Sequence, residues 1–132
     1  CPDCGGARLR SEALTVFVGG KHIGEIAGMS IGEAFHFLKE IKLSEQDAAV
    51  AEQIKKEILN RMSYLLEVGL DYLTLNRRSS TLSGGEMERI HLATALGSKL
   101  SGSLYILDEP TVGLHPRDTR RLVSVLKEIR DL

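Results

Sequence analysis

The chain has 132 residues, of which 42% are hydrophobic and 27% charged, and its formal net charge is −1 at pH 7. This composition is typical of one globular core, and the scattered basic residues give no overall field that would attract nucleic acid or an anionic membrane. No apolar run approaches the roughly 18 residues of a membrane span and no signal-peptide pattern occurs, so we expect no membrane association and a cytoplasmic location.

The first segment, residues 1–11, carries the two cysteines of the chain, Cys1 and Cys4, in a C-x-x-C spacing. Small residues beside such a pair let a turn fold around a metal, which favours one half of a tetrahedral zinc knuckle over a redox dithiol. The other two ligands would lie upstream or on another chain, although His22 and His36 could contribute. The chain opens on Cys1 and a helical pattern still runs at Leu132, so we expect a fragment of a longer protein.

Residues 12–28 alternate apolar and polar side chains on either side of Gly19 and Gly20. This pattern predicts a two-stranded hairpin with a Gly-Gly turn. The Gly20-Lys21 pair does not belong to a phosphate-binding P-loop, because His22 stands where that motif needs Ser or Thr.

Residues 29–102 predict three capped helices. Ser30 with Glu33 forms a capping box, a second helix runs from Ser44 to about Val68 and ends at Gly69, and a connector over 71–81 leads to a third helix over 83–100. The apolar sides expected in the core are Phe37, Leu38 and Ile41; Ala51, Ile54, Ile58, Met62 and Leu65; and Ile90, Ala93, Leu96 and Leu100.

Residues 103–132 begin with a short apolar run over 103–107 that predicts a strand buried on both faces of a parallel sheet. Pro110 ends the strand, and Pro116 suits the first turn of a fourth helix that buries Leu122, Val125, Leu126 and Ile129. The fold class is therefore α/β but mainly helical.

The third helix starts with Ser83, Gly84, Gly85 and Glu86. Helix capping alone explains Ser83 and Glu86, but two glycines inside a first turn cost about 1 kcal/mol each relative to alanine. Bare amides at the positive end of a helix dipole bind phosphate, so we take these four residues as a candidate nucleotide-binding turn.

The apolar run over 103–107 delivers Asp108 and Glu109 at its exit. Neighbouring residues on a strand face opposite ways, so we assign Asp108 to Mg²⁺ and Glu109 to the orientation of an attacking water as a catalytic residue. The alternative is an acidic turn at a strand end. His115, after a tight turn, is either a further catalytic residue that reaches a nucleotide across an interface or only the start of a helix.

The run TLSGGEMERIHLATALGSKLSGSLYILDEPTVGLHPRD resembles the signature, Walker B and D-loop of ABC ATPases. Together with CPDCGGARL and VGLDYLTL it is similar to the UvrA family of excinuclease subunits, and to the first of their two nucleotide-binding halves. On this resemblance the segments are half of a zinc knuckle (1–11), a β-hairpin (12–28), a helical signature subdomain (29–102), and the Walker B strand, D-loop and following helix of the ATPase core (103–132).

The resemblance implies a DNA damage-recognition ATPase of nucleotide excision repair, in which ATP is held between the P-loop of one half and the signature of the other. Its cofactors would be ATP, Mg²⁺ and Zn²⁺ in the intact protein, while the fragment alone need hold none. Its partners would be damaged double-stranded DNA, UvrB, the second nucleotide-binding half and a second UvrA subunit.

The chain departs from the family pattern at Met87 and Glu88, which stand where Ala and Gln are usual. It also lacks a P-loop and the strand that carries the switch histidine. We therefore expect no ATPase activity from the fragment alone.

Two alternatives stay open on the sequence. The fragment could be a zinc-containing module that binds DNA or a partner, for which Arg77, Arg78 and Lys99 near the glycine turn are the motivation. It could also come from another ABC class, such as a transporter or a chromosome-maintenance ATPase, although the paired cysteines and the Gly-Leu-His turn argue against that.

Overall fold

The computed structural model describes residues 4, 6, 8–98, 104–111, 114 and 116–131. The described chain is mainly helical, with one two-stranded antiparallel sheet, which confirms the expected fold class. In chain order the elements are η1 (Ser11–Thr15), β1 (Phe17–Val18), β2 (Lys21–His22), α1 (Ile23–Gly28), α2 (Ile31–Glu40), α3 (Glu45–Glu67), η2 (Ser79–Thr81), α4 (Gly84–Ser98) and α5 (Pro116–Arg130).

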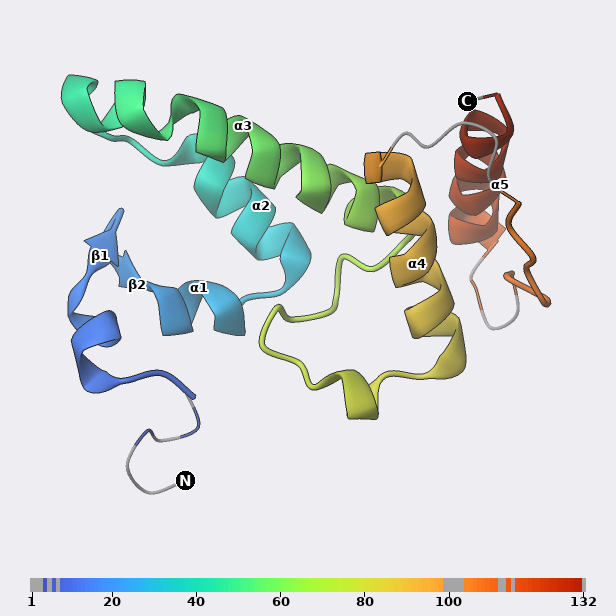
Figure 1. Cartoon of the computed structure of the whole chain (residues 1–132), viewed down its shortest axis with the longest axis horizontal. Helices are drawn as coiled ribbons and strands as arrows, with labels where there is room; N and C mark the ends of the chain where they lie inside the picture. Colours follow the sequence, from blue (N-terminus) through green and yellow to red (C-terminus); the bar gives the residue numbers. More distant parts are fainter. Residues whose placement is uncertain are drawn as a thin grey trace.

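The long helix α3 organises the molecule, with α2 and α4 packed along it and α5 beyond α4 (Figure 1). Its start is fixed by Ser44, whose hydroxyl oxygen accepts a hydrogen bond from the Asp47 amide at 3.2 Å. Its end is fixed by Gly69, where φ is +75° and the Leu70 amide donates back to the Leu65 carbonyl at 3.0 Å. This left-handed cap favours glycine, so the predicted boundaries of the helix are confirmed.

The core lies where the C-terminal half of α3 meets α2, α4 and α5. Leu70, Leu92 and Leu122 are fully buried there, together with Val68. Of the predicted apolar side of α5, Leu122 and Val125 are buried while Leu126 and Ile129 are half-buried. Each buried leucine contributes roughly 1.5–3 kcal/mol relative to an exposed one, so this cluster anchors the start and the packing of α4.

The predicted hairpin is confirmed at its turn but is much shorter than expected. Phe17 pairs with His22 around the Gly-Gly turn, while the residues before it form η1 and those after it form α1. The His22 side chain caps α1 and Glu25 completes the capping box, so the chain turns helical at once after β2. Histidine is not among the favoured capping residues, and the sequence pattern therefore missed this helix.

The connector between α3 and α4 is fastened to the N-terminal helices by backbone hydrogen bonds. The Ile31 amide donates to the Leu73 carbonyl at 2.7 Å, and the Asn76 amide donates to the Ala27 carbonyl at 3.0 Å. An isolated antiparallel bridge joins Ser30 to Thr74. The connector is therefore irregular but held to both α1 and α2, and it leads from the end of α3 to the first turn of α4 (Figure 1).

The strand predicted over 103–107 is not formed in residues 104–107, which the structure describes. Leu104 and Ile106 are each 87% exposed, and Tyr105 is 37% exposed. A parallel strand gains its stability from neighbours on both edges and both faces, and the described residues provide no such neighbours. The prediction of a buried strand is therefore wrong for the chain as it stands here.

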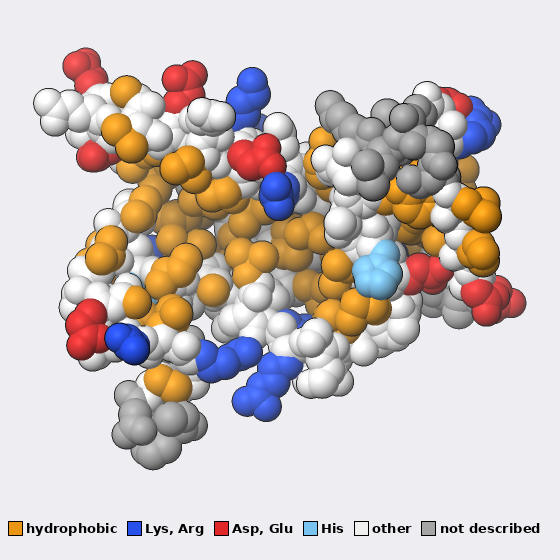
Figure 2. All heavy atoms as spheres, in the orientation of Figure 1, with side chains coloured by type: hydrophobic (Ala, Val, Ile, Leu, Met, Phe, Trp, Pro, Cys, Tyr) orange, Lys and Arg blue, Asp and Glu red, His pale blue; other side chains and the backbone are white. Residues whose placement is uncertain are grey.

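A hollowed face between α3 and the hairpin with α1 is rich in hydrophobic side chains (Figure 2). Exposed large apolar side chains on these elements are Phe17, Val18 and Ile23, and Val50, Ile54 and Ile58. Of the predicted core side of α3, Met62 is buried, whereas Ile54 and Ile58 are exposed.

Among the described helices, none combines the length and apolar character that crossing a membrane requires.

Candidate functional site: a glycine turn at the start of a helix

The 83–86 turn opens α4 with a complete capping box. The Ser83 amide donates to the Glu86 carboxylate at 2.7 Å, and the Glu86 amide donates to the Ser83 hydroxyl oxygen at 3.3 Å. The Ser83 hydroxyl also donates to the same carboxylate at 3.0 Å. The predicted capping is therefore confirmed, and two of the amides at this helix start are occupied by side chains.

The two glycines between them remain open. Gly84 and Gly85 are exposed, and a Cβ added at Gly84 would meet nothing within 4 Å. Among the described residues, no protein group accepts a hydrogen bond from either glycine amide, since both lie in the first turn of the helix. The turn thus presents two donors at the positive end of the α4 dipole, where an anion can approach the backbone.

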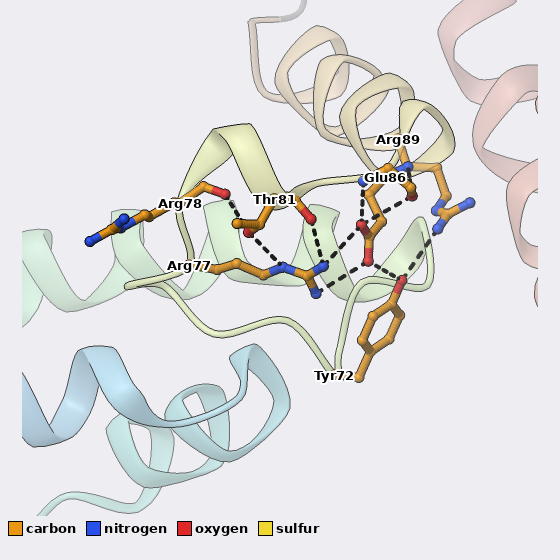
Figure 3. A network of polar contacts seen from close by, with 7 residues as sticks. Tyr72, Arg77, Arg78, Thr81, Glu86 and Arg89 are labelled. Carbon is orange, nitrogen blue, oxygen red and sulfur yellow. Dashed lines mark hydrogen bonds and ion pairs between the residues drawn. The ribbon is translucent and has the colours of Figure 1, made fainter.

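The Glu86 carboxylate is the centre of a polar network (Figure 3). Glu86 is 6% exposed, and its carboxylate accepts from the Tyr72 hydroxyl at 2.9 Å and from the Arg77 guanidinium at 3.4 Å. Arg77 also donates to the Thr81 carbonyl at 2.9 Å. The hydrogen bond from the Ser83 amide, aided by Tyr72 and Arg77, holds the pKa of Glu86 below its usual value despite burial.

The second buried charge of this region is Arg89, one turn further along α4. The residue is 6% exposed, and its Nη2 donates to the Tyr72 hydroxyl oxygen at 3.5 Å. Its Nη1 would lie 3.5 Å from a Cβ at Gly85, so the guanidinium lies beside the glycine turn. Burial and the hydrogen bond to Glu86 raise the pKa of Tyr72, which keeps its hydroxyl a donor to the carboxylate.

The sequence did not single out Tyr72 or Arg89, although one signal was present. Glu86, Arg89, Ala93 and Leu96 follow a spacing of three, four and three residues, so two charged residues fall in line with the buried side of the helix. A charged pair at core positions is unusual and points to a polar network. Tyr72 lies in a connector without periodicity, and its role follows only from the tertiary structure.

The acidic pair lies apart from the 83–86 turn. Asp108 and Glu109 are exposed, and Figure 1 places the 104–111 segment beyond α5, away from the first turn of α4. Glu109 has φ of +46°, a left-handed conformation that is uncommon outside glycine. The chain therefore does not assemble one site from the two sets of residues, and their metal and catalytic roles stay predictions.

Two further candidate residues, His115 and Cys1, lie outside the described residues. Cys4 is half-buried, and hydrogen bonds from the backbone of Arg8 and then Gly6 lower the pKa of its thiol. Among the described residues, no group of three or more His, Cys, Asp or Glu side chains could hold a metal ion. The zinc half-site stays a prediction.

Comparison with known proteins matches the chain to one family. The sequence model described as ABC transporter covers residues 9–112, which include the 83–86 turn and the acidic pair. The chain is 59% identical over all of its 132 residues to UvrABC system protein A from Staphylococcus aureus strain MRSA252, and 57% identical to the protein of that name from Bacillus subtilis strain 168. It spans 14% of the length of these relatives.

A solved structure gives the same result for the fold. The crystal structure of UvrA2 from Deinococcus radiodurans superposes with a TM-score of 0.88 at 38% identity, covering 99% of this chain and 18% of that chain. The resemblance inferred from the glycine turn and the acidic pair is thereby confirmed. The chain belongs to the ABC transporter family and is similar along its whole length to a segment of UvrABC system protein A.

Proposed function

We propose that the full-length protein containing this chain is an ABC-type ATPase, and that the 83–86 turn binds the terminal phosphoryl group of an ATP molecule delivered by another lobe. The observation that carries this proposal is the pair of open amides at Gly84 and Gly85, framed by a capping box that leaves them free. These donors would meet a triphosphate without a side chain in between, and they would follow the negative charge that develops during phosphoryl transfer.

In this proposal the acidic pair serves the hydrolysis step at its own half. Glu109 orients the attacking water and accepts its proton as the bond to the terminal phosphorus forms and the bond to the leaving oxygen breaks. Asp108 offers the carboxylate oxygens that Mg²⁺ prefers, and that ion would supply charge neutralisation on the phosphate oxygens. His115 would approach the nucleotide across the interface between halves.

We further propose a place in nucleotide excision repair. Support comes from the similarity of the whole chain to UvrABC system protein A, a similarity that an independent zinc-containing interaction module would not require. The partners would be damaged double-stranded DNA, UvrB, the second nucleotide-binding half and a second copy of the subunit. A cytoplasmic location follows from action on bacterial DNA.

A zinc site at the start of the chain is part of the proposal. Hydrogen bonds from backbone amides favour the thiolate of Cys4, which is the form that binds zinc. Cys1 would be its partner in the C-x-x-C pair, and two further ligands would come from elsewhere in the full-length protein. This zinc would be structural, because a complete set of four ligands leaves no position for a substrate.

The test is ATP hydrolysis by the full-length protein with Glu109→Gln, and with Glu40→Gln on α2 as a control for the change of charge. We expect Glu109→Gln to lower turnover at this half by about 10²–10⁴-fold, the usual range for a general base, while ATP still binds. The isolated chain should release no phosphate above its own Glu109→Gln variant. Unchanged turnover in the full-length variant would remove Glu109 from the mechanism.

A further inference from the structure

A buried positive charge next to the 83–86 turn lacks the counter-charge that buried arginines normally have. Among the described residues, Arg89 Nε is the one fully buried side-chain nitrogen or oxygen atom without a hydrogen-bond partner. Among the same residues, Arg89 makes no ion pair with a carboxylate, and the Tyr72 hydroxyl is its only side-chain hydrogen-bond partner. Burying a guanidinium without a counter-charge costs free energy, which indicates that this charge has a function other than stabilising the fold.

The nearby charges do not balance it. Glu86 is the one carboxylate of the network, and it is already engaged by Arg77, by Tyr72 and by the Ser83 amide. The start of α4 adds the positive end of a helix dipole to the two guanidinium groups. The region therefore carries an excess of positive charge, which an anion at the open amides would neutralise.

The position of Arg89 fits that anion. Its side chain runs back along α4 toward the first turn, as helical side chains do, and its Nη1 lies beside Gly85 on the same turn that presents the open amides. The Tyr72 hydroxyl accepts from Nη2 on the other side of the guanidinium and donates to Glu86 (Figure 3). Tyr72 thus fixes the buried charge against the turn.

We propose that Arg89 supplies the buried positive charge by which the 83–86 turn prefers a nucleoside triphosphate to a diphosphate, and that Tyr72 is the positioning residue that holds it there. This inference rests on the proposed function of the turn. A triphosphate places one more doubly negative group at the open amides than a diphosphate does, and the partly screened attraction of Arg89 acts on that group alone. A structural arginine would stabilise the protein equally with either nucleotide.

The experiment measures the affinity of the full-length protein for a non-hydrolysable ATP analogue and for ADP. The variants are Arg89→Met, which keeps length without charge; Arg89→Lys, which keeps charge; and Tyr72→Phe, which removes only the hydroxyl. We expect Arg89→Met to weaken analogue binding about tenfold, the effect of one charge-assisted interaction, with ADP binding changed less than about twofold. Arg89→Lys should restore most of the preference, and Tyr72→Phe should lose about threefold of it.

Gly84→Val is the control that distinguishes the role of Arg89 from the proposed function of the 83–86 turn. A loss of analogue preference in Gly84→Val with an unchanged ratio in both Arg89→Met and Tyr72→Phe would overturn the role of Arg89 and leave the proposed function intact. An unchanged ratio in Gly84→Val would overturn both. Should Arg89→Met fail to fold, Tyr72→Phe decides: a loss for the analogue alone supports the proposed role of Arg89, whereas an equal loss for the analogue and ADP, or no loss, overturns it.

Discussion

The 83–86 turn and the 104–111 segment carry the two halves of the proposed chemistry, yet the chain builds them very differently. The turn is fixed by short-range hydrogen bonds between Ser83 and Glu86 and by a buried network behind them. The 104–111 segment has no regular structure, and Leu104 and Ile106 within it are almost fully exposed. Local capping forms from residues three positions apart, whereas a central parallel strand needs partners that come from distant sequence.

This difference explains why the described chain fixes the 83–86 turn but not the acidic pair. The buried residues Leu92 and Leu96 further along α4 hold the helix in the core, so the amides of its first turn keep one orientation. Asp108 and Glu109 depend on a sheet that would fix the strand before them. This difference is consistent with a site in which the glycine turn comes from one lobe and the two carboxylates come from another.

The strongest stability contrast compares Leu92→Ala in α4 with Ile106→Ala before the acids. Leu92 is 1% exposed, so its truncation should lower the free energy of unfolding of the chain by about 2–5 kcal/mol. Ile106 is 87% exposed, so the same change there should stay within about 0.5 kcal/mol. Urea unfolding followed by circular dichroism measures both, and similar losses would mean that the 104–107 segment is packed.

A smaller effect separates capping from binding within the turn itself. Ser83→Ala removes the side chain that accepts from the Glu86 amide and should cost about 1 kcal/mol of folding stability. Ser44→Ala removes the corresponding cap of α3, far along the chain, and should cost a similar amount. Only Ser83→Ala should also weaken ATP turnover in the full-length protein. Equal turnover in the two variants would show that Ser83 has no part in nucleotide binding.

The pH dependence of stability gives the smallest effect. The pKa of Glu86 is lowered in the folded chain, first by the Ser83 amide, so its ionised form is favoured by folding. Its contribution is fully present above the pKa of an unfolded glutamate, about 4.3, and is lost as the pH falls through the lower pKa of the folded chain. The melting temperature of the wild-type chain should therefore fall more steeply on acidification than that of Glu86→Gln.

Glu33→Gln provides the benchmark for that slope. Glu33 lies in the capping box of α2, and the Ser30 amide lowers its pKa without the help of a buried network. The acid dependence removed by Glu86→Gln should exceed the dependence removed by Glu33→Gln. The reverse order would show that Tyr72 and Arg77 add nothing to the stability of the Glu86 carboxylate.

The sequence predicted the parts of the fold that depend on neighbours in the chain. The caps at Ser30, Ser44 and Ser83 and the stop at Gly69 are side-chain or backbone features of a single turn, and all four are found. The hairpin turn was predicted for the same reason. At Gly19 the φ is +59°, which strains any other residue, and an added Cβ would lie 2.7 Å from the Ile41 side chain and force it to move.

The features that the sequence did not predict depend on tertiary contacts. The strand over 104–107 was inferred from apolar composition, but composition does not supply the neighbouring strands. Helix α1 was missed because His22 caps it in place of Ser or Asp. The contact between Tyr72 and Arg89 joins residues 17 positions apart across an irregular connector. The helical spacing places Arg89 on the buried side of α4, but it does not identify Tyr72 as its partner.

The most direct measurement of the central claim is Gly84→Ala, because it separates folding from binding in opposite directions. A methyl group at Gly84 meets no neighbour and replaces glycine in a helix, so the chain should gain up to about 1 kcal/mol of stability. In the full-length protein the same methyl group would stand in the path of the phosphate, so ATP turnover should fall. A variant that is more stable and fully active would contradict the account.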